Sequence, residues 1–329
     1  MTTMMKAWQF ERYGRYDEVL EWVGRPLPEP GPNEARVRTR AVSLNFPDLL
    51  ITQGLYQARA PLPAVSGVEG VGIVEAVGPG SPFEVGQRVV SFNNLAGMLA
   101  DCFIAHNATS WAVPDHVSDS QAAALSTTYG TSYYALVHRA HIQPGETLLV
   151  AGAAGGVGLA AVQLGKVFGA RVIAAAGSAE KLAVCRDNGA DELINYQEED
   201  IVERVKALTD GRGADVIYDP VGADLFDQMK RCIAWEGRML VIGFAGGRIP
   251  TIECNRMLLK NMAVVGLAWG PCVERNPAQG AACQQHLYDL LRVGAIDPVI
   301  YRTLPFAEVR EGMRLMESRA LYGKIVIER

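Results

Sequence analysis

The chain has 329 residues, of which 49% are hydrophobic and 8% aromatic, and its formal net charge is −5 with no basic run. This length exceeds what one hydrophobic core usually serves, so we expect two domains, and the charge predicts no nucleic-acid or membrane-surface partner. No stretch reaches the roughly 18 apolar residues of a membrane span, and residues 1–10 lack the apolar core of a signal peptide, so we expect a cytoplasmic protein.

The cysteines and histidines offer no metal site. The six cysteines are dispersed, and no two form a C-x-x-C pair. This spacing predicts neither a disulfide framework nor a four-cysteine zinc site. His138 and His141 could share one helix face, but no cysteine or carboxylate joins them locally, so we interpret them as solvated helix residues. We therefore expect no bound metal.

Short strand patterns dominate the first 125 residues. Residues 34–43 alternate polar and apolar side chains, residues 67–78 indicate a glycine-punctuated strand pair, and residues 85–91 indicate a further strand. Short strands with frequent glycine and proline are typical of a partly closed β-barrel. Residues 118–140 are rich in helical patterns and lead into the next domain.

A glycine-rich turn between a strand and a helix lies within residues 146–161. Its form is Ala153-x-Gly155-x-x-Gly158, with alanine at the first glycine of the usual G-x-G-x-x-G pattern. Such a turn can be merely structural, but glycine also lets the backbone approach a phosphate, and helix N-terminal amides attract anions. We expect the pyrophosphate of a dinucleotide to bind at Gly155, Gly156, Val157 and Gly158.

Strand and helix patterns alternate after this turn. Strands are predicted at 171–176, 192–195, 214–219, 238–242 and 262–267, and helices at 178–188, 200–209 and 225–233. Crossovers long enough for helices predict an α/β fold with a doubly wound parallel sheet. A helix at 278–294 and a strand at 322–328 follow. We assign residues 126–267 to a dinucleotide-binding domain, and residues 1–125 with 268–329 to the barrel domain.

The end of the second strand of this sheet indicates which dinucleotide binds. An NAD site places a carboxylate about 20 residues beyond the glycine turn, where it accepts from the ribose 2′-hydroxyl. Gly177 stands there instead, 19 residues after Gly158, and Ser178 and Lys181 follow. A hydroxyl and an ammonium suit a 2′-phosphate. Glu180 is the counter-evidence, but we expect it to point to solvent or to pair locally, and we predict NADPH as the cofactor.

The chain resembles a known family at motifs spread along its whole length. In chain order these are Asn45-Phe-Pro-Asp48, Gly54-Leu-Tyr56, Gly67-Val-Glu-Gly-Val-Gly72, Val85-Gly-Gln-Arg-Val89, Gly130-Thr-Ser-Tyr-Tyr-Ala135, Gly152-Ala-Ala-Gly-Gly-Val-Gly158 and Tyr322-Gly-Lys-Ile-Val326. Together they are similar to the zeta-crystallin-type quinone oxidoreductases, the zinc-independent branch of the medium-chain dehydrogenase/reductase superfamily. The resemblance implies a GroES-like catalytic domain, a Rossmann domain, an NADPH site in the cleft between them, and a homodimer joined edge to edge through the nucleotide-domain sheets.

The zinc-dependent branch of that superfamily differs at two positions. It has a cysteine ligand where this chain has Asn45, and the histidine of a Gly-His-Glu motif where this chain has Val68. Valine cannot ligate a metal, and an amide is a poor substitute for a thiolate, so we predict a zinc-independent site. Without a Lewis acid to lower the pKa of an alcohol, the site is better suited to an electron-poor acceptor.

The resemblance also implies roles for single residues. Asn45 and Tyr56 would position or polarise the acceptor oxygen, and Tyr56 is the phenol of the early loop that could donate to it. Positions that match cofactor contacts of the family are Asn45, Thr131, Tyr196, Val221, Phe244, Leu267, Arg319 and Lys324. Tyr196 and Arg319 match the adenosine phosphate end, with surface packing as the alternative. For Phe244 and Leu267 the alternative is a place in the core.

These observations predict an NADPH-dependent oxidoreductase that transfers hydride to a quinone or quinone-like acceptor without zinc. The cofactor would supply the chemistry, and the protein would orient the reactants in a cleft from which water is excluded. The first alternative is an NADPH-dependent reductase of enones, enals or enoyl-thioesters. An alternative of another class is an NADPH-binding structural or regulatory protein with little turnover. The sequence leaves these alternatives and the natural substrate open.

Overall fold

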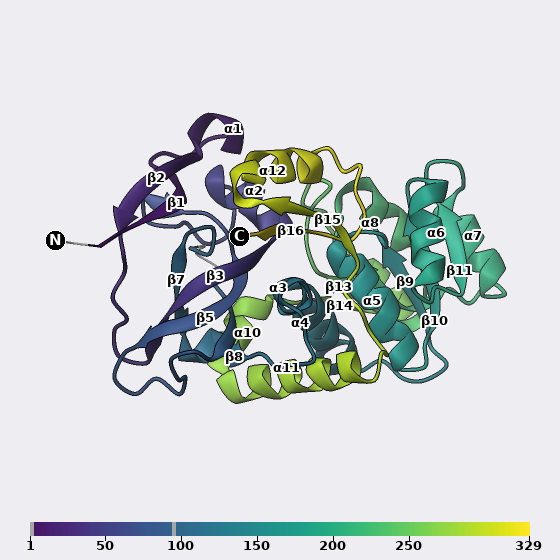
Figure 1. Ribbon diagram of the computed structural model, residues 1–329. Coiled ribbons are helices and arrows are strands. Elements are labelled where there is room, and N and C mark those ends of the chain that lie inside the picture. The colour runs from purple at the N-terminus through teal and green to yellow at the C-terminus, as the bar shows by residue number, and fades with distance from the viewer. Residues whose placement is uncertain (1–2, 94–96) are drawn as a thin grey trace. The chain divides into compact units, whose positions relative to one another are not determined.

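The computed structural model describes residues 3–93 and 97–329, and the chain divides into two compact units (Figure 1). The barrel unit contains Met1–Thr127, Gly270–Arg292 and Ile300–Arg329. The α/β unit contains Thr128–Trp269 and Val293–Val299. Each unit has its own cluster of buried apolar side chains, centred on residues such as Phe10 in the first and Leu149 in the second.

A six-stranded parallel sheet forms the α/β unit, in the order β11-β10-β9-β12-β13-β14. Its strands are β9 (Thr147–Ala151), β10 (Arg171–Ala176), β11 (Glu192–Asn195), β12 (Ala214–Asp219), β13 (Ile233–Val241) and β14 (Ala263–Gly266). The chain begins in the middle of the sheet, builds one half, and returns to build the other. This is the doubly wound Rossmann arrangement expected from the sequence.

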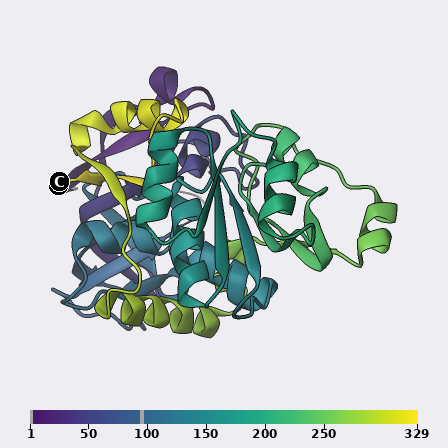
Figure 2. The same cartoon turned by 90° about the vertical axis from the view of Figure 1, so that its right-hand side faces the viewer.

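Helices lie on both sides of this sheet (Figure 2). They are α4 (Thr128–Tyr133), the π-helical segment η2 (Tyr134–Arg139), α5 (Gly156–Val167), α6 (Ala179–Asp187), α7 (Ile201–Leu208), α8 (Ala223–Met229) and α9 (Cys254–Lys260). Side-chain caps set two of the starts, because Ser178 accepts from the Lys181 N–H before α6 and Asp200 accepts from the Val202 N–H before α7. The covering helices leave the central strand β9 buried at every residue.

Two sequence expectations for the α/β unit are wrong. The helix expected up to residue 233 ends at Met229, and β13 begins at Ile233 rather than at 238. Ile233 and Ala234 are buried in the sheet layer, so tertiary packing outweighs their helical pattern. In addition, α9 lies outside all the predicted elements. None of its residues is buried, so it has no apolar face that a sequence pattern could reveal.

The barrel unit contains two sheets. The larger has the order β15-β16-β3-β5-β6-β8, with β7 also paired to β3, and the smaller has the order β2-β1-β4. Their strands are β1 (Met4–Phe10), β2 (Glu21–Pro26), β3 (Glu34–Leu44), β4 (Ala64–Val65), β5 (Glu69–Val77), β6 (Arg88–Phe92), β7 (Cys102–His106), β8 (Ser110–Ala112), β15 (Ile300–Pro305) and β16 (Lys324–Glu328). The partly closed barrel predicted from the sequence is confirmed.

The strand pair expected at residues 67–78 is instead the single strand β5. Its glycines mark a close approach between neighbouring strands and not a turn, since a Cβ on Gly72 would lie 2.0 Å from the carbonyl oxygen of Arg38. Strand β16 pairs with β3 so that Ile325 faces Leu44. This register brings Lys324 and Asn45, which are far apart in sequence, to one end of the larger sheet.

The remaining helices belong to the barrel unit. They are α1 (Tyr16–Val19), α2 (Phe46–Thr52), η1 (Asn107–Thr109), α3 (Asp119–Leu125), α10 (Trp269–Arg275), α11 (Pro277–Arg292), η3 (Phe306–Glu308) and α12 (Val309–Glu317). Trp269, at the start of α10, is an exception and belongs to the α/β unit. Helix α2 follows β3 directly through Asn45, its N-cap residue. It therefore fixes the direction in which the chain leaves the sheet at the end where Lys324 lies.

Candidate functional site

The glycine-rich turn joins β9 to the N-terminus of α5. Gly152 adopts the left-handed conformation (φ +55°), and the Gly155 N–H donates to the Gly152 carbonyl at 3.0 Å. A Cβ on Gly158 would lie 2.4 Å from the same carbonyl oxygen, so only glycine fits there. The N–H groups of Gly156, Val157 and Gly158 open α5 and lack helical acceptors by position, which makes this helix end suited to a phosphate.

Residues predicted to hold a 2′-phosphate meet at the ends of β10 and β11. A Cβ on Gly177 would lie 3.2 Å from the Tyr196 hydroxyl, so Tyr196 stands beside the residue that precedes Ser178. Ser178 caps α6, and Lys181 lies in the first turn of that helix, half-buried. Glu180 is exposed, in agreement with its expected solvent position.

The remaining predicted cofactor residues of the α/β unit also follow strands of the sheet, except Thr131, which lies half-buried on α4. Val221 follows β12 and lies against the glycine turn, 3.0 Å from where a Cβ on Gly152 would be. Phe244 and Leu267 follow β13 and β14, and both are half-buried, so neither belongs to the core. Because the strands are parallel, these residues share the carboxyl edge of the sheet, where doubly wound folds bind ligands.

A buried polar cluster lies in the barrel unit, where β3, β5 and β16 meet the start of α2. Lys324 Nζ donates to Asn45 Oδ1 at 2.6 Å, to the Leu44 carbonyl at 2.9 Å and to Glu69 Oε1 at 3.4 Å. Asn45 Nδ2 donates to Glu69 Oε1 at 3.0 Å and to the Ser43 carbonyl at 3.1 Å. Lys324 and Asn45 are each 5% exposed, and Glu69 is fully buried.

This network determines how the Asn45 amide is oriented. Lysine only donates and an ionised glutamate only accepts, so the amide must present its oxygen to Lys324 and its nitrogen to Glu69. Both Nδ2 hydrogens are then bonded within the protein, and so are all three hydrogens of the Lys324 ammonium. The geometry therefore favours a positioning role for Asn45 over the expected donation to an acceptor oxygen.

Asp48 and Tyr56 lie beside this cluster. Burial raises the pKa of Asp48 to about 7, against the opposing effects of the Asn45 N–H, which donates to Asp48 Oδ2 at 2.8 Å, and of the Lys324 ammonium. Burial also raises the pKa of Tyr56, as does the negative charge of Asp48. Tyr56 is half-buried and keeps its proton at neutral pH, so its hydroxyl can serve as a donor.

The predicted site residues fall into both units. Asn45, Tyr56 and Lys324 belong to the barrel unit with Arg319, which is exposed on the turn after α12 and has a positive φ of 55°. The others belong to the α/β unit. Glu69 is a further member of the site that was not predicted from the sequence. A carboxylate within an apolar, glycine-rich strand was the available signal, since glutamate is almost never fully buried unless it is paired.

The cluster at Asn45 does not fit a metal ion. The Lys324 ammonium already occupies the space between Asn45 Oδ1 and Glu69 Oε1, and it would repel a second cation. Val68 is buried in the apolar core and offers no ligand atom. Within residues 3–93 and 97–329, no group of three or more His, Cys, Asp or Glu side chains could hold a metal ion.

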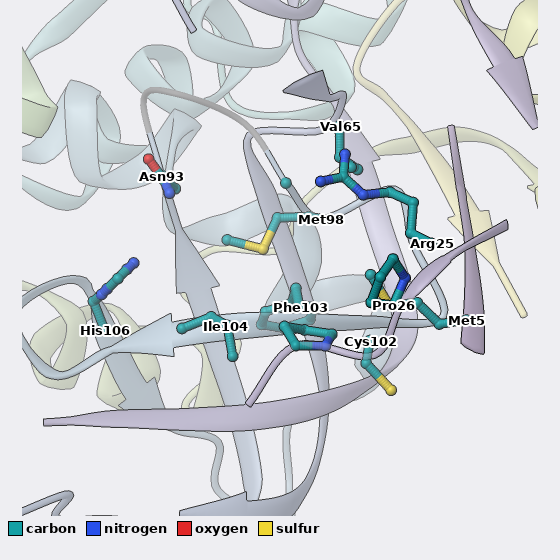
Figure 3. A pocket seen from close by; sticks show the side chains of 12 residues that line it. Met5, Arg25, Pro26, Val65, Asn93, Met98, Cys102, Phe103, Ile104 and His106 are labelled. Carbon is teal, nitrogen blue, oxygen red and sulfur yellow. The ribbon is translucent and has the colours of Figure 1, made fainter. Parts of the chain in front are cut away.

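A separate cavity of about 220 Å³ lies in the barrel unit (Figure 3). Its lining comes from β1, β2, β7 and the segments beside them, and includes Arg25, Cys102 and His106 but no predicted site residue. The Arg25 guanidinium is bonded to Gln9 at 2.7 Å, and burial raises the pKa of Cys102 to about 12. A thiol held in its neutral form is a poor nucleophile, so Cys102 gives this cavity no reactive thiolate.

Comparisons with known proteins cover nearly the whole chain. Residues 31–143 match the alcohol dehydrogenase GroES-like domain, and residues 156–282 match the domain described as zinc-binding dehydrogenase. The chain is 38% identical over 311 residues to quinone oxidoreductase-like protein 2 of Rattus norvegicus, covering 94% of this chain and 88% of that protein. It is 34% identical over 325 residues to a quinone oxidoreductase of Pseudomonas aeruginosa, covering 98% of this chain and 99% of that protein.

Solved structures agree with these relatives. The Escherichia coli quinone oxidoreductase complexed with NADPH superimposes with a TM-score of 0.91 at 30% identity, covering 99% of this chain and 100% of that chain. The Pseudomonas syringae quinone oxidoreductase gives a TM-score of 0.92 at 32% identity, covering 99% of this chain and 100% of that chain.

The part of the chain that the structure describes contains no helix with the length and apolar character needed to cross a bilayer.

Proposed function

Because the chain belongs to the zeta-crystallin-like, quinone oxidoreductase branch of the medium-chain dehydrogenase/reductase superfamily and is an NADPH-dependent oxidoreductase, we propose that it transfers hydride to a quinone or quinone-like acceptor without zinc. The observation that carries this proposal is the Lys324 ammonium, held at 2.6 Å from Asn45 Oδ1 and 3.4 Å from Glu69 Oε1. With that cation in place and no Lewis acid to activate an alcohol, the site favours an acceptor that is already electron-poor.

The α/β unit holds NADPH, which supplies the hydride when bound. The N–H groups of Gly156, Val157 and Gly158 would hold the pyrophosphate, and Ser178, Lys181 and Tyr196 would hold the 2′-phosphate. A serine hydroxyl that caps a helix through its lone pair still has a proton to donate, and the lysine adds a charge-assisted bond. Val221, Phe244 and Leu267 supply apolar surface along the same edge of the sheet.

The barrel unit provides the donor for the acceptor oxygen. Hydride addition to a quinone or an enone leaves negative charge on that oxygen, and a donor aimed at it lowers the barrier. Tyr56 is the donor we propose, because its hydroxyl stays protonated while both N–H bonds of the Asn45 amide are used internally. The proton that completes the reduction comes from water.

We also propose that the protein is a homodimer, joined through the β14 edge of the α/β sheet. Strand β14 is the last in the sheet order, and the adjoining helix α9, light green at the right of Figure 2, has no buried residue. Three large apolar side chains near this edge are exposed, namely Ile249, Leu258 and Leu259. A second copy would cover both the open strand edge and this apolar surface. Light scattering after gel filtration measures the mass directly.

An acceptor screen tests the function. NADPH oxidation would be followed with benzoquinones and naphthoquinones, with enones and enals, and with enoyl-thioesters. The proposal expects the highest kcat/KM for quinones. A clear preference for enones or enoyl-thioesters would move the assignment to a conjugated-carbonyl reductase, and tight NADPH binding with no turnover of any acceptor would indicate a binding protein.

A further inference from the structure

Glu69 bonds to both other members of the buried cluster and also to a backbone group outside it. Its Oε1 accepts from Asn45 Nδ2 at 3.0 Å and from Lys324 Nζ at 3.4 Å, and its Oε2 accepts from the Thr127 N–H at 2.8 Å. The residue is fully buried on β5. One carboxylate thus joins four segments of the barrel unit: its own strand, the start of α2, β16 and the segment that follows α3.

Fold stability alone does not require such a group. A buried ion pair is expensive to desolvate, and apolar residues of similar volume replace such pairs at little or no cost in stability. The glycine-rich strand β5 has apolar residues at most other inward positions, and Val68 beside Glu69 belongs to the apolar core. A carboxylate in this position therefore needs a role that packing does not supply.

The bonds of Glu69 point to that role. Lys324 donates to the oxygen of the Asn45 amide, and Glu69 accepts from its nitrogen, so the two charges hold the amide from both ends. Asn45 starts α2, and the chain passes from α2 into the loop that presents Tyr56. Glu69 also supplies the negative charge that keeps an ammonium tolerable in an apolar environment. Its loss would release both Lys324 and Asn45.

We propose that Glu69 is a positioning residue for hydride transfer, which fixes Asn45 and Lys324 at the reacting end of the barrel unit. The inference rests on the proposed function, because it assigns Glu69 to that same reaction. Glu69 is fully buried and so has no exposed atom to contact an acceptor. It acts through Asn45 and Lys324, which match cofactor-lining positions of the family.

Three variants and one control test this role. Glu69→Gln removes the charge at constant size, Lys324→Met removes the cation, and the double variant restores neutrality. Glu75→Gln on the same strand is the matched control, since Glu75 lies outside the cluster and pairs with Arg38 at the surface. For each protein, the unfolding temperature, the NADPH dissociation constant and kcat with a quinone would be measured.

The expected result separates kcat from binding and from stability. Glu69→Gln should lower kcat roughly 10- to 100-fold, from loss of charged hydrogen bonds, and should lower kcat by a larger factor than it weakens NADPH binding. The double variant should regain the unfolding temperature lost in Glu69→Gln and should have a lower kcat than Lys324→Met, so the comparison of these two variants supplies the measurement if Glu69→Gln does not fold. Glu75→Gln should match the wild type.

Two results would overturn the inference. An unchanged kcat in Glu69→Gln would remove Glu69 from the reaction, and a double variant with wild-type kcat would reduce the pair to a structural element. Failure of the proposed function looks different, because the wild-type protein itself would then turn over no acceptor. An active wild type with an equally active Glu69→Gln variant would reject only the role of Glu69.

Discussion

The buried carboxyl of Asp48 should contribute stability that is lost as the pH rises from about 4 to about 7. Burial raises its pKa from 3.8 to about 7 in the folded state. A group with a raised folded pKa binds more protons when folded, so its stabilising effect is complete below the unfolded value and is lost through the folded value. The difference between 3.8 and about 7 corresponds to roughly 4 kcal/mol as an upper estimate.

Asp48→Asn isolates this effect. The asparagine cannot ionise but keeps an oxygen that accepts from the Asn45 N–H. The free energy of unfolding would be measured by denaturant titration at several pH values between 4 and 8, for the wild type and the variant. Relative to the variant, the wild type should lose several kcal/mol across that interval. Asp115→Asn, at an exposed carboxyl of the same unit, is the control.

Parallel pH profiles for the wild type and Asp48→Asn would refute this reasoning. They would mean that Asp48 titrates in the folded protein as it does in the unfolded chain. In that case the Lys324 ammonium and the N–H of Asn45 would offset the whole cost of burying the charge. The electrostatic description of the cluster would then need Asp48 to be ionised throughout.

Three further predictions concern the cofactor and the acceptor. Lys181→Ala should weaken NADPH binding about 10- to 150-fold and leave NADH binding nearly unchanged, as measured by fluorescence titration. An equal loss of affinity for both cofactors would exclude a 2′-phosphate contact. Tyr56→Phe should lower kcat roughly 10-fold on an enone and less on an electron-poor quinone, and unchanged steady-state kcat on both would exclude donation. Gly158→Ala should destabilise the fold by about 1–3 kcal/mol, because its Cβ would lie 2.4 Å from a carbonyl oxygen, whereas Gly155→Ala, at 3.4 Å, should leave the unfolding temperature unchanged.

The strands of the α/β sheet could be predicted where the local sequence carries the whole signal. Residues 171–176, 192–195 and 214–219 are short apolar runs that begin and end at turn residues, and the structure places β10, β11 and β12 at the same bounds. The start of β13 could not be predicted, because Ile233 joins the strand through contacts with β12. The local sequence pattern predicts the bounds of a strand only where pairing with a neighbouring strand does not change them.

The residues of the candidate site also differ in whether the local sequence predicts them. Gly158 and Ser178 have local signatures, a glycine-rich turn and a helix cap, which a sequence reader can recognise. Glu69 has only a weak local signal, a carboxylate within a glycine-rich strand, because its partners Asn45 and Lys324 lie 24 and 255 residues away in the chain. Only the register of β16 against β3 brings these three side chains together. The internal use of the Asn45 amide hydrogens follows from that register as well.

One measurement tests the central claim most directly, namely the rate of NADPH-dependent quinone reduction before and after exhaustive dialysis against a strong zinc chelator. We predict an unchanged rate and zinc well below one ion per chain, because Lys324 fills the cationic position beside Asn45 and Glu69. A rate that falls on chelation and returns when zinc alone is added back would contradict it.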